Sequence, residues 1–160
     1  MIRPARPEDM PALLNIYAAA RRFMADTGNP NQWPEGHPSA PMLSADIAAG
    51  HLYVEVQDGV PHAAFAFIVG EDPTYGYIED GAWLSDEPYG TIHRLASDGA
   101  VPGFFTRCVA FCRERTGHLR VDTHHDNRVM QHLANKEGFV RCGIIYLANG
   151  SPRIAYERMD

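Results

Sequence analysis

The stretch HRLASDGAVPGFFTRC, residues 93–108, joins an apolar run to a helical pattern through small and polar residues at 97–99. The run predicts a strand over 92–97, and the large apolar residues that follow recur at helical spacing as far as Gly117. The first N–H groups of a helix lack internal partners, and the helix dipole attracts negative charge there. The stretch therefore predicts either a phosphate-binding turn or a plain strand-to-helix connection.

The elements on either side alternate between strands and helices. On the N-terminal side we predict a strand over 2–5, a helix from Pro7 to Gly28, a loop over 29–41, a short helix capped by Ser44, and strands over 52–56 and 63–69 joined at Asp58-Gly59. On the C-terminal side we predict a strand over 119–123, a helix over 127–137, and a hairpin of 139–147 and 153–156 around Asn149-Gly150. Strands joined through helices favour an α/β fold with a mixed sheet.

Composition and charge limit the class of protein. The chain has 160 residues, which suits one domain with a core of its own. Its net charge of -6 lacks the broad positive field that non-specific binding to nucleic acid or anionic membranes needs. No apolar run approaches the roughly 20 residues that cross a bilayer, and the N-terminus has no apolar signal core. We expect a cytoplasmic protein without nucleic-acid or membrane partners.

Two clusters of residue types allow more than one interpretation. Cys108 and Cys112 lie one helical turn apart, and with Cys142 they make an odd number, which favours reduced, buried thiols over a disulfide or a metal pair. Residues 71–90, called the acidic segment below, contain six Asp or Glu and no Lys or Arg. This segment is either a solvated connection or an acidic wall that attracts a cationic substrate.

The run over residues 92–139 resembles the GNAT N-acetyltransferase superfamily. Three motifs carry the resemblance: IHRLAS as the central strand, DTHHDN as the next strand and its exit, and NRVMQHLANKEGF as the following helix. The helix fits the family pattern Asn-x-x-Ala-x-x-Leu-Tyr-x-x-x-Gly-Phe at Asn127, Leu133, Gly138 and Phe139, with Met130 in place of Ala. The N-terminal strand and helix and the CGIIYL strand are also similar. The resemblance implies a GNAT-like acyl-CoA N-acyltransferase fold, a central mixed sheet flanked by helices, as one domain over 1–160.

The resemblance also implies acetyl-CoA as cosubstrate, without a metal. In this family the pantetheine arm pairs with the central strand, and the pyrophosphate lies on backbone N–H groups at the start of the next helix. By this match, the residues beside pantetheine would be Leu95, Ala96 and Ser97. Those beside the pyrophosphate would be Gly99, Ala100, Val101, Gly103 and Phe104. Asn127 would steady the cofactor arm.

The sequence departs from the family pattern at two places. The turn DGAVPGFF lacks the Arg or Gln of the signature Arg/Gln-x-x-Gly-x-Gly/Ala, and Pro102 has no N–H to donate. The tyrosine that many members use as general acid aligns with Ala134. These departures support an alternative function, a degenerate domain that binds CoA or another small ligand without catalysis. A protein-interaction scaffold is a third hypothesis.

Direct acetyl transfer needs a base for the amine and an acid or dipole for the departing sulfur. An imidazole changes protonation near neutral pH, so His93 on the central strand is the candidate base. Tyr146 on a later strand is the candidate acid if it faces the cleft. For each of them, a packed or hydrogen-bonded structural role is the alternative.

Two other chemistries receive less support. His124, His125 and Asp126 are metal-ligand types, but adjacent residues on an extended chain point to opposite sides, so we expect no single metal to use both histidines. A serine hydrolase is not indicated, because no Gly-x-Ser-x-Gly elbow occurs. We predict a transferase that moves acetyl from acetyl-CoA to a primary amine of a small molecule or peptide, which enters near residues 29–41 and the acidic segment. A homodimer is compatible with this prediction.

Overall fold

The computed structural model describes all 160 residues and contains one seven-stranded sheet in the order β1-β2-β3-β4-β5-β7-β6. The strands are β1 (Ile2–Pro4), β2 (Leu52–Gln57), β3 (Val60–Val69), β4 (Gly90–Ser97), β5 (His118–Thr123), β6 (Val140–Tyr146) and β7 (Pro152–Met159). The helices are α1 (Met10–Asp26), α2 (Ala40–Ala48), α3 (Phe104–Arg113) and α4 (Arg128–Lys136), with 3-10 turns η1 (Pro7–Asp9) and η2 (Pro73–Tyr75). The mixed α/β fold and the order of its elements confirm the sequence prediction. None of the helices is both long and apolar enough to span a membrane.

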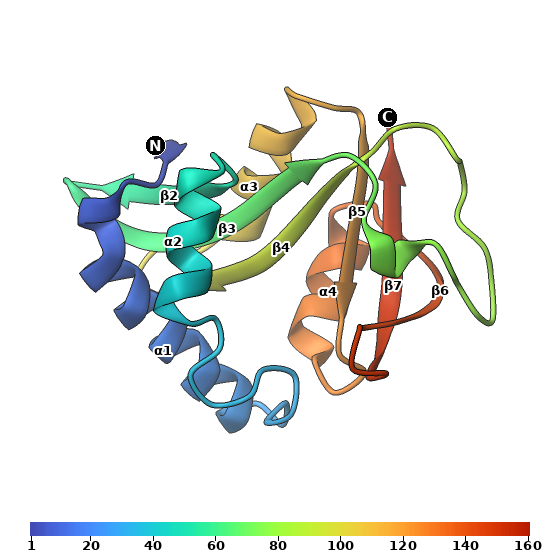
Figure 1. Cartoon of the computed structure of the whole chain (residues 1–160), viewed down its shortest axis with the longest axis horizontal. Helices are drawn as coiled ribbons and strands as arrows, with labels where there is room; N and C mark the ends of the chain where they lie inside the picture. Colours follow the sequence, from blue (N-terminus) through green and yellow to red (C-terminus); the bar gives the residue numbers. More distant parts are fainter.

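The parallel strands β4 and β5 separate along their length. Their pairing ends at Thr91 opposite Arg120, whereas β4 stays paired with β3 as far as Ser97. Figure 1 shows the two strands close together at one end and spread apart at the other. Beyond Thr91, the edge of β4 that faces β5 therefore has no neighbouring strand, and a gap opens inside the sheet.

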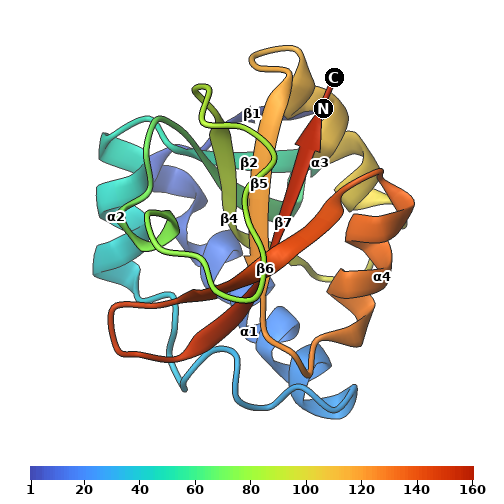
Figure 2. The same cartoon turned by 90° about the vertical axis from the view of Figure 1, so that its right-hand side faces the viewer.

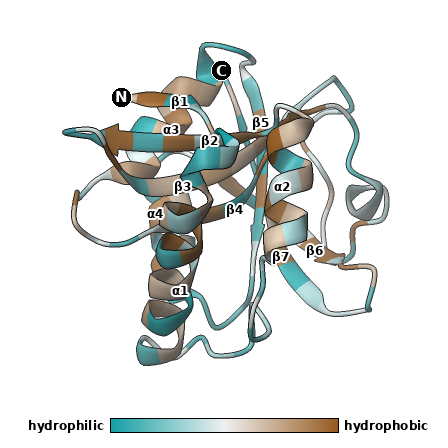
Figure 3. Ribbon diagram, turned by 60° about the vertical axis from the view of Figure 1, so that its left-hand side comes forward, coloured by the Kyte–Doolittle hydropathy of each residue, from teal (hydrophilic) through white to brown (hydrophobic).

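Helices and the acidic segment cover the two faces of the sheet. α3 and α4 lie on one face over the largest apolar cluster, which includes Phe65 and Leu119. α1 and α2 cover the β1–β4 half of the other face, and the acidic segment covers the remaining half around Tyr75 and Tyr89 (Figure 2). Figure 3 shows apolar residues along β2, β3 and one side of α1. Burial of these apolar surfaces on both faces is the main stabilising contribution to the fold.

A bulge in β4 is held by hydrogen bonds to α1 and α2. Arg94 has a φ of 48°, and the register with β3 shifts between Ala64 and Ala66. The Tyr17 hydroxyl donates to the Arg94 carbonyl oxygen at 2.6 Å, and the Arg94 guanidinium donates twice to Asp46, at 2.8 and 3.0 Å. A positive φ is unfavourable for a residue with a Cβ. α1 and α2 thus hold a strained residue and fix where β4 bends.

The acidic segment is attached to the sheet at several places. Glu79 and Ile144 exchange backbone hydrogen bonds of 2.8 Å, and a Cβ on the neighbouring Gly143 would lie 2.5 Å from the Glu79 carbonyl oxygen. Further along, the Leu84 N–H donates at 2.5 Å to the carboxylate of Glu157, which is completely buried. The segment is therefore anchored to the sheet, while more than half of its residues are exposed.

One capping prediction was wrong and one cysteine prediction is confirmed. α2 begins at Ala40, because Ser39 rather than Ser44 is its cap: Ser39 Oγ accepts from the Met42 N–H at 3.3 Å. Pro41 fits in the first turn, where its missing N–H would have had no partner. The three cysteines are buried and free.

Candidate active site

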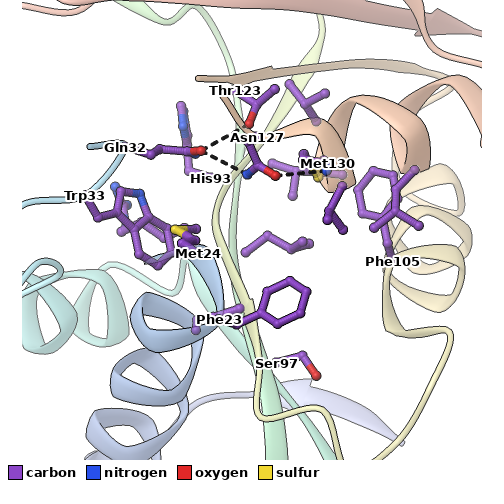
Figure 4. A pocket seen from close by; sticks show the side chains of 18 of the residues that line it. Phe23, Met24, Gln32, Trp33, His93, Ser97, Phe105, Thr123, Asn127 and Met130 are labelled. Atoms are coloured by element: carbon purple, nitrogen blue, oxygen red, sulfur yellow. Dashed lines mark hydrogen bonds between the residues drawn. The ribbon is translucent and has the colours of Figure 1, made fainter. Parts of the chain in front are cut away.

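A cavity of about 970 Å³ occupies the gap between β4 and β5. Its walls come from α1, the loop after it, β4 and β5, the turn before α3, the start of α3, and α4. Figure 4 shows Phe23 and Met24 of α1 on one side and Phe105 and Met130 on the other. A site of this size with mixed apolar and polar walls suits a large organic ligand.

Eight of the nine predicted cofactor-binding residues line this cavity, and Ala100 is the exception. The eight are Leu95, Ala96, Ser97, Gly99, Val101, Gly103, Phe104 and Asn127. The structure thus gathers residues from the strand, the turn and both helices around one space. Their contact with a cofactor stays a prediction.

The turn before α3 satisfies part of its own hydrogen-bonding capacity. The Gly99 N–H donates to Ser97 Oγ at 3.0 Å, and the Ala100 N–H donates to Asp98 Oδ1 at 2.9 Å. The helix begins at Phe104, so the N–H groups of its first turn have no acceptor inside the helix. These donors are free for an anion, whereas the N–H groups of Gly99 and Ala100 are already engaged.

His93 and Asp72 form a polar pair in the cavity wall. His93 Nε2 lies 2.9 Å from Asp72 Oδ2, and Asp72 Oδ1 accepts from the N–H and hydroxyl of Thr74 at 2.8 and 2.7 Å. Burial alone would raise the pKa of Asp72, but the hydrogen bonds from His93 and Thr74 together outweigh it and hold the pKa at about 2. An ionised carboxylate only accepts hydrogen bonds, so Nε2 of His93 carries the hydrogen that is donated to Asp72.

Four of the polar residues of the cavity wall that sequence reasoning missed are Gln32, Asp72, Asp122 and Arg153. Asp122 accepts a hydrogen bond of 2.6 Å from the Tyr75 hydroxyl, and burial raises the pKa of its carboxyl although that bond works against the change. The position of Asp122 near the carboxyl end of a strand was the one available signal. The other three lie on segments whose placement depends on tertiary packing.

Gln32 ties the loop after α1 to the far side of the cavity (Figure 4). Its Oε1 accepts from Asn127 Nδ2 and Asn29 Nδ2 at 2.9 Å and from Thr123 Oγ1 at 3.3 Å. Asn127 Oδ1 accepts from the Met130 N–H at 3.0 Å and so caps α4. Both polar ends of the Asn127 side chain are therefore engaged within the protein.

Tyr146 does not line the cavity. Its hydroxyl donates to Glu79 at 2.8 Å, and its ring lies 6.4 Å from that of Tyr77. Tyr146 was the candidate acid only if it faced the cleft. In the structure it lies outside the cavity that His93 lines. Among the acidic residues of the acidic segment, Asp72 alone lines the cavity.

The expected geometry of His124 and His125 was wrong. Their rings stack with centroids 4.2 Å apart, because the chain turns directly after β5 instead of staying extended. The possible ligand atoms of both histidines and Asp126 lie within 4.8 Å of one another. His124 Nδ1 accepts from the Asp126 N–H at 3.0 Å, so part of this cluster stabilises the turn.

This architecture is that of the acyl-CoA N-acyltransferases. A GNAT-family acetyltransferase from Streptococcus agalactiae is 31% identical with a TM-score of 0.84, over 100% of this chain and 95% of that one. A GNAT-family acetyltransferase from Listeria monocytogenes has the same fold at 18% identity and a TM-score of 0.71, over 100% and 94%. The GNAT-like decarboxylase GphF, solved with isobutyryl-CoA, has this fold at 16% identity and a TM-score of 0.64, over 99% of this chain and 98% of that one.

The chain belongs to the GNAT acetyltransferase family. No family model and no curated protein matches its sequence. Membership supports a general acetyltransferase role, and it confirms the family predicted from the IHRLAS, DTHHDN and NRVMQHLANKEGF motifs.

Proposed function

We propose that this protein transfers an acetyl group from acetyl-CoA to a primary amine of a small molecule or peptide. One observation carries the proposal: the gap between β4 and β5, the start of α3 and the His93–Asp72 pair all border the same cavity. That GphF, with the same fold, was solved with isobutyryl-CoA supports an acyl-CoA thioester as donor.

The acetyl-CoA would lie with its pantetheine arm along the unpaired edge of β4. Amide groups of the arm can pair there as a strand would, because β5 has already diverged. The pyrophosphate would accept from the N–H groups in the first turn of α3. Lys136, the one lysine of the chain, lies in the last turn of α4 on the cavity wall and would pair with a phosphate.

His93 would act as the general base. Its Nδ1 takes a proton from the acceptor ammonium, and the Asp72 carboxylate stabilises the imidazolium that forms. The amine nitrogen then attacks the thioester carbonyl carbon, the C–S bond breaks, and the second amine proton goes to the departing sulfur. Backbone N–H groups on the free edge of β4 would stabilise the oxyanion of the tetrahedral intermediate.

The test is release of CoA thiol from acetyl-CoA with a panel of primary amines. We expect turnover with at least one amine and a loss of about 10²- to 10⁴-fold in kcat for His93→Ala, as for removal of a general base. His132→Ala, on an exposed residue of α4, is the matched control and should keep full activity.

A thermal-shift titration with acetyl-CoA accompanies the assay. Stabilisation without turnover on any amine would favour the alternative, a domain that binds CoA without catalysis. Full activity of His93→Ala would refute His93 as base, and absence of both binding and turnover would refute acetyl-CoA as the cosubstrate.

A further inference from the structure

Arg153, at the start of β7, is a buried cation without an ion-pair partner. It is 6% exposed and lines the cavity. Its guanidinium donates to three neutral oxygens: Ser151 Oγ at 2.6 Å and the carbonyls of Pro152 and Gln32 at 2.8 and 3.0 Å. No carboxylate oxygen lies within 4.0 Å of it, whereas the comparably buried Arg120 contacts Glu157 at 2.6 Å.

A buried charge without a counterion is unfavourable, so proteins normally pair such groups. Burial lowers the pKa of Arg153, against the attraction of Asp122. An arginine has five N–H donors in a planar fork, and three of the hydrogen bonds that it can make are used here. The remaining N–H groups of the guanidinium can bind a planar anion, and the two oxygens of a carboxylate fit their geometry.

Strand register places this cation beside Asp122 of the cavity wall. Asp122 of β5 is paired with Ala155 of β7, so Arg153, two residues away, is on the same face of the sheet as Asp122. The backbones of such diagonal neighbours are about 7–8 Å apart, within reach of long side chains. Arg153 nevertheless makes its hydrogen bonds to neutral oxygens, and Asp122 attracts it without a direct ion pair. His93 and Asp72 border the same cavity. The cavity wall therefore contains two carboxylates, one imidazole and one guanidinium, which belong to Asp72, Asp122, His93 and Arg153.

From this arrangement we infer that the acceptor carries a carboxylate beside its amine, as an amino acid does, and that Arg153 binds that carboxylate. The amine would then lie toward His93, where the carboxylates of Asp72 and Asp122 attract an ammonium group. A peptide N-terminus or a simple amine would leave Arg153 unpaired. The phosphates of CoA are excluded as its partner because the start of α3 lies on one face of the sheet, whereas Arg153 shares the opposite face with Asp122, which contacts Tyr75 of the acidic segment. This inference rests on the proposed function and narrows its acceptor.

Matched pairs of acceptors test the inference on the unaltered protein. Free amino acids are compared with their α-amides, which keep the amine and side chain and lose the negative charge, with rates expressed per unprotonated amine. We expect kcat/KM to be at least about tenfold higher for the preferred acid than for its amide, the scale of a charged hydrogen bond. Equal use of acids and amides would overturn the inference while leaving the proposed function intact.

Arg153→Met supplies the second measurement. It should lower kcat/KM for the acid by about tenfold or more, with little change for the amide and none in acetyl-CoA binding. Arg141→Met, on an exposed residue of β6, is the control. Equal losses for acid and amide would assign Arg153 a merely structural role and overturn the inference. If no amine is acetylated, the proposed function fails, and titration of the wild type with the same pairs decides the inference: equal binding of acid and amide overturns it.

Discussion

Replacing Asp72 by Asn should destabilise the protein in a way that depends on pH. The pKa of Asp72 is about 2, compared with an ordinary 3.8. A tenfold change in proton affinity is worth about 1.4 kcal/mol, so the depression corresponds to about 2 kcal/mol in favour of the folded state. Asn keeps a carbonyl for the Thr74 contacts and loses the charge that holds His93. The expected loss at pH 7 is therefore about 1–2 kcal/mol.

The direction of the pH effect follows from the sign of the shift. A carboxyl whose folded pKa is depressed adds stability above its unfolded pKa, near 3.8, and loses it as the pH falls through about 2. Urea unfolding followed by circular dichroism at pH 7, 5, 4 and 3 should show the gap between wild type and Asp72→Asn narrowing below pH 4. Asp86→Asn, on an exposed carboxylate, is the control. A gap that is absent at pH 7, or the same at every pH, would refute the reasoning.

Three further predictions concern the bulge, the acidic segment and the cofactor. Tyr17→Phe removes the hydroxyl that donates to the Arg94 carbonyl and should lower the free energy of unfolding in urea by about 1–3 kcal/mol. An unchanged unfolding midpoint would show that this hydrogen bond does not stabilise the bulge. Gly143→Ala should cost about 2–4 kcal/mol, because its Cβ would lie 2.5 Å from the Glu79 oxygen, whereas Gly150→Ala, with open space around it, should cost about 1–2 kcal/mol. Lys136→Met should weaken the binding of CoA, measured by calorimetry, about tenfold and leave the binding of acetyl-pantetheine unchanged. Equal weakening of both would show that Lys136 does not bind a phosphate.

Much of the fold was predictable because its signals are local. The Asp58-Gly59 hairpin has φ values of 53° and 79°, which Asp and Gly tolerate better than most residues. The α2 cap was mispredicted because Ser39 and Ser44 both precede apolar residues, and the choice between them depended on accepting Pro41 inside the first turn.

The site was predictable where its residues lie in the motifs that carry the family resemblance. Residues of β4, the following turn and α3 appear together in one stretch, and the helix motif added Asn127 at the start of α4. Asp72 and Arg153 reach it from distant segments that tertiary contacts place. The side to which Tyr146 points could not be predicted, because the register between β6 and β7 shifts between Arg141 and Gly143, and such an irregularity disturbs the alternation of side chains along a strand.

The divergence of β4 from β5 gives the sheet an internal edge in addition to the two outer ones at β1 and β6. An exposed edge is normally a template for aggregation, but this one lines a cavity between α1 and α4. A ligand that pairs with backbone groups is recognised without regard to side-chain identity. Binding of the proposed cosubstrate at this edge should consequently tolerate extensive substitution along β4.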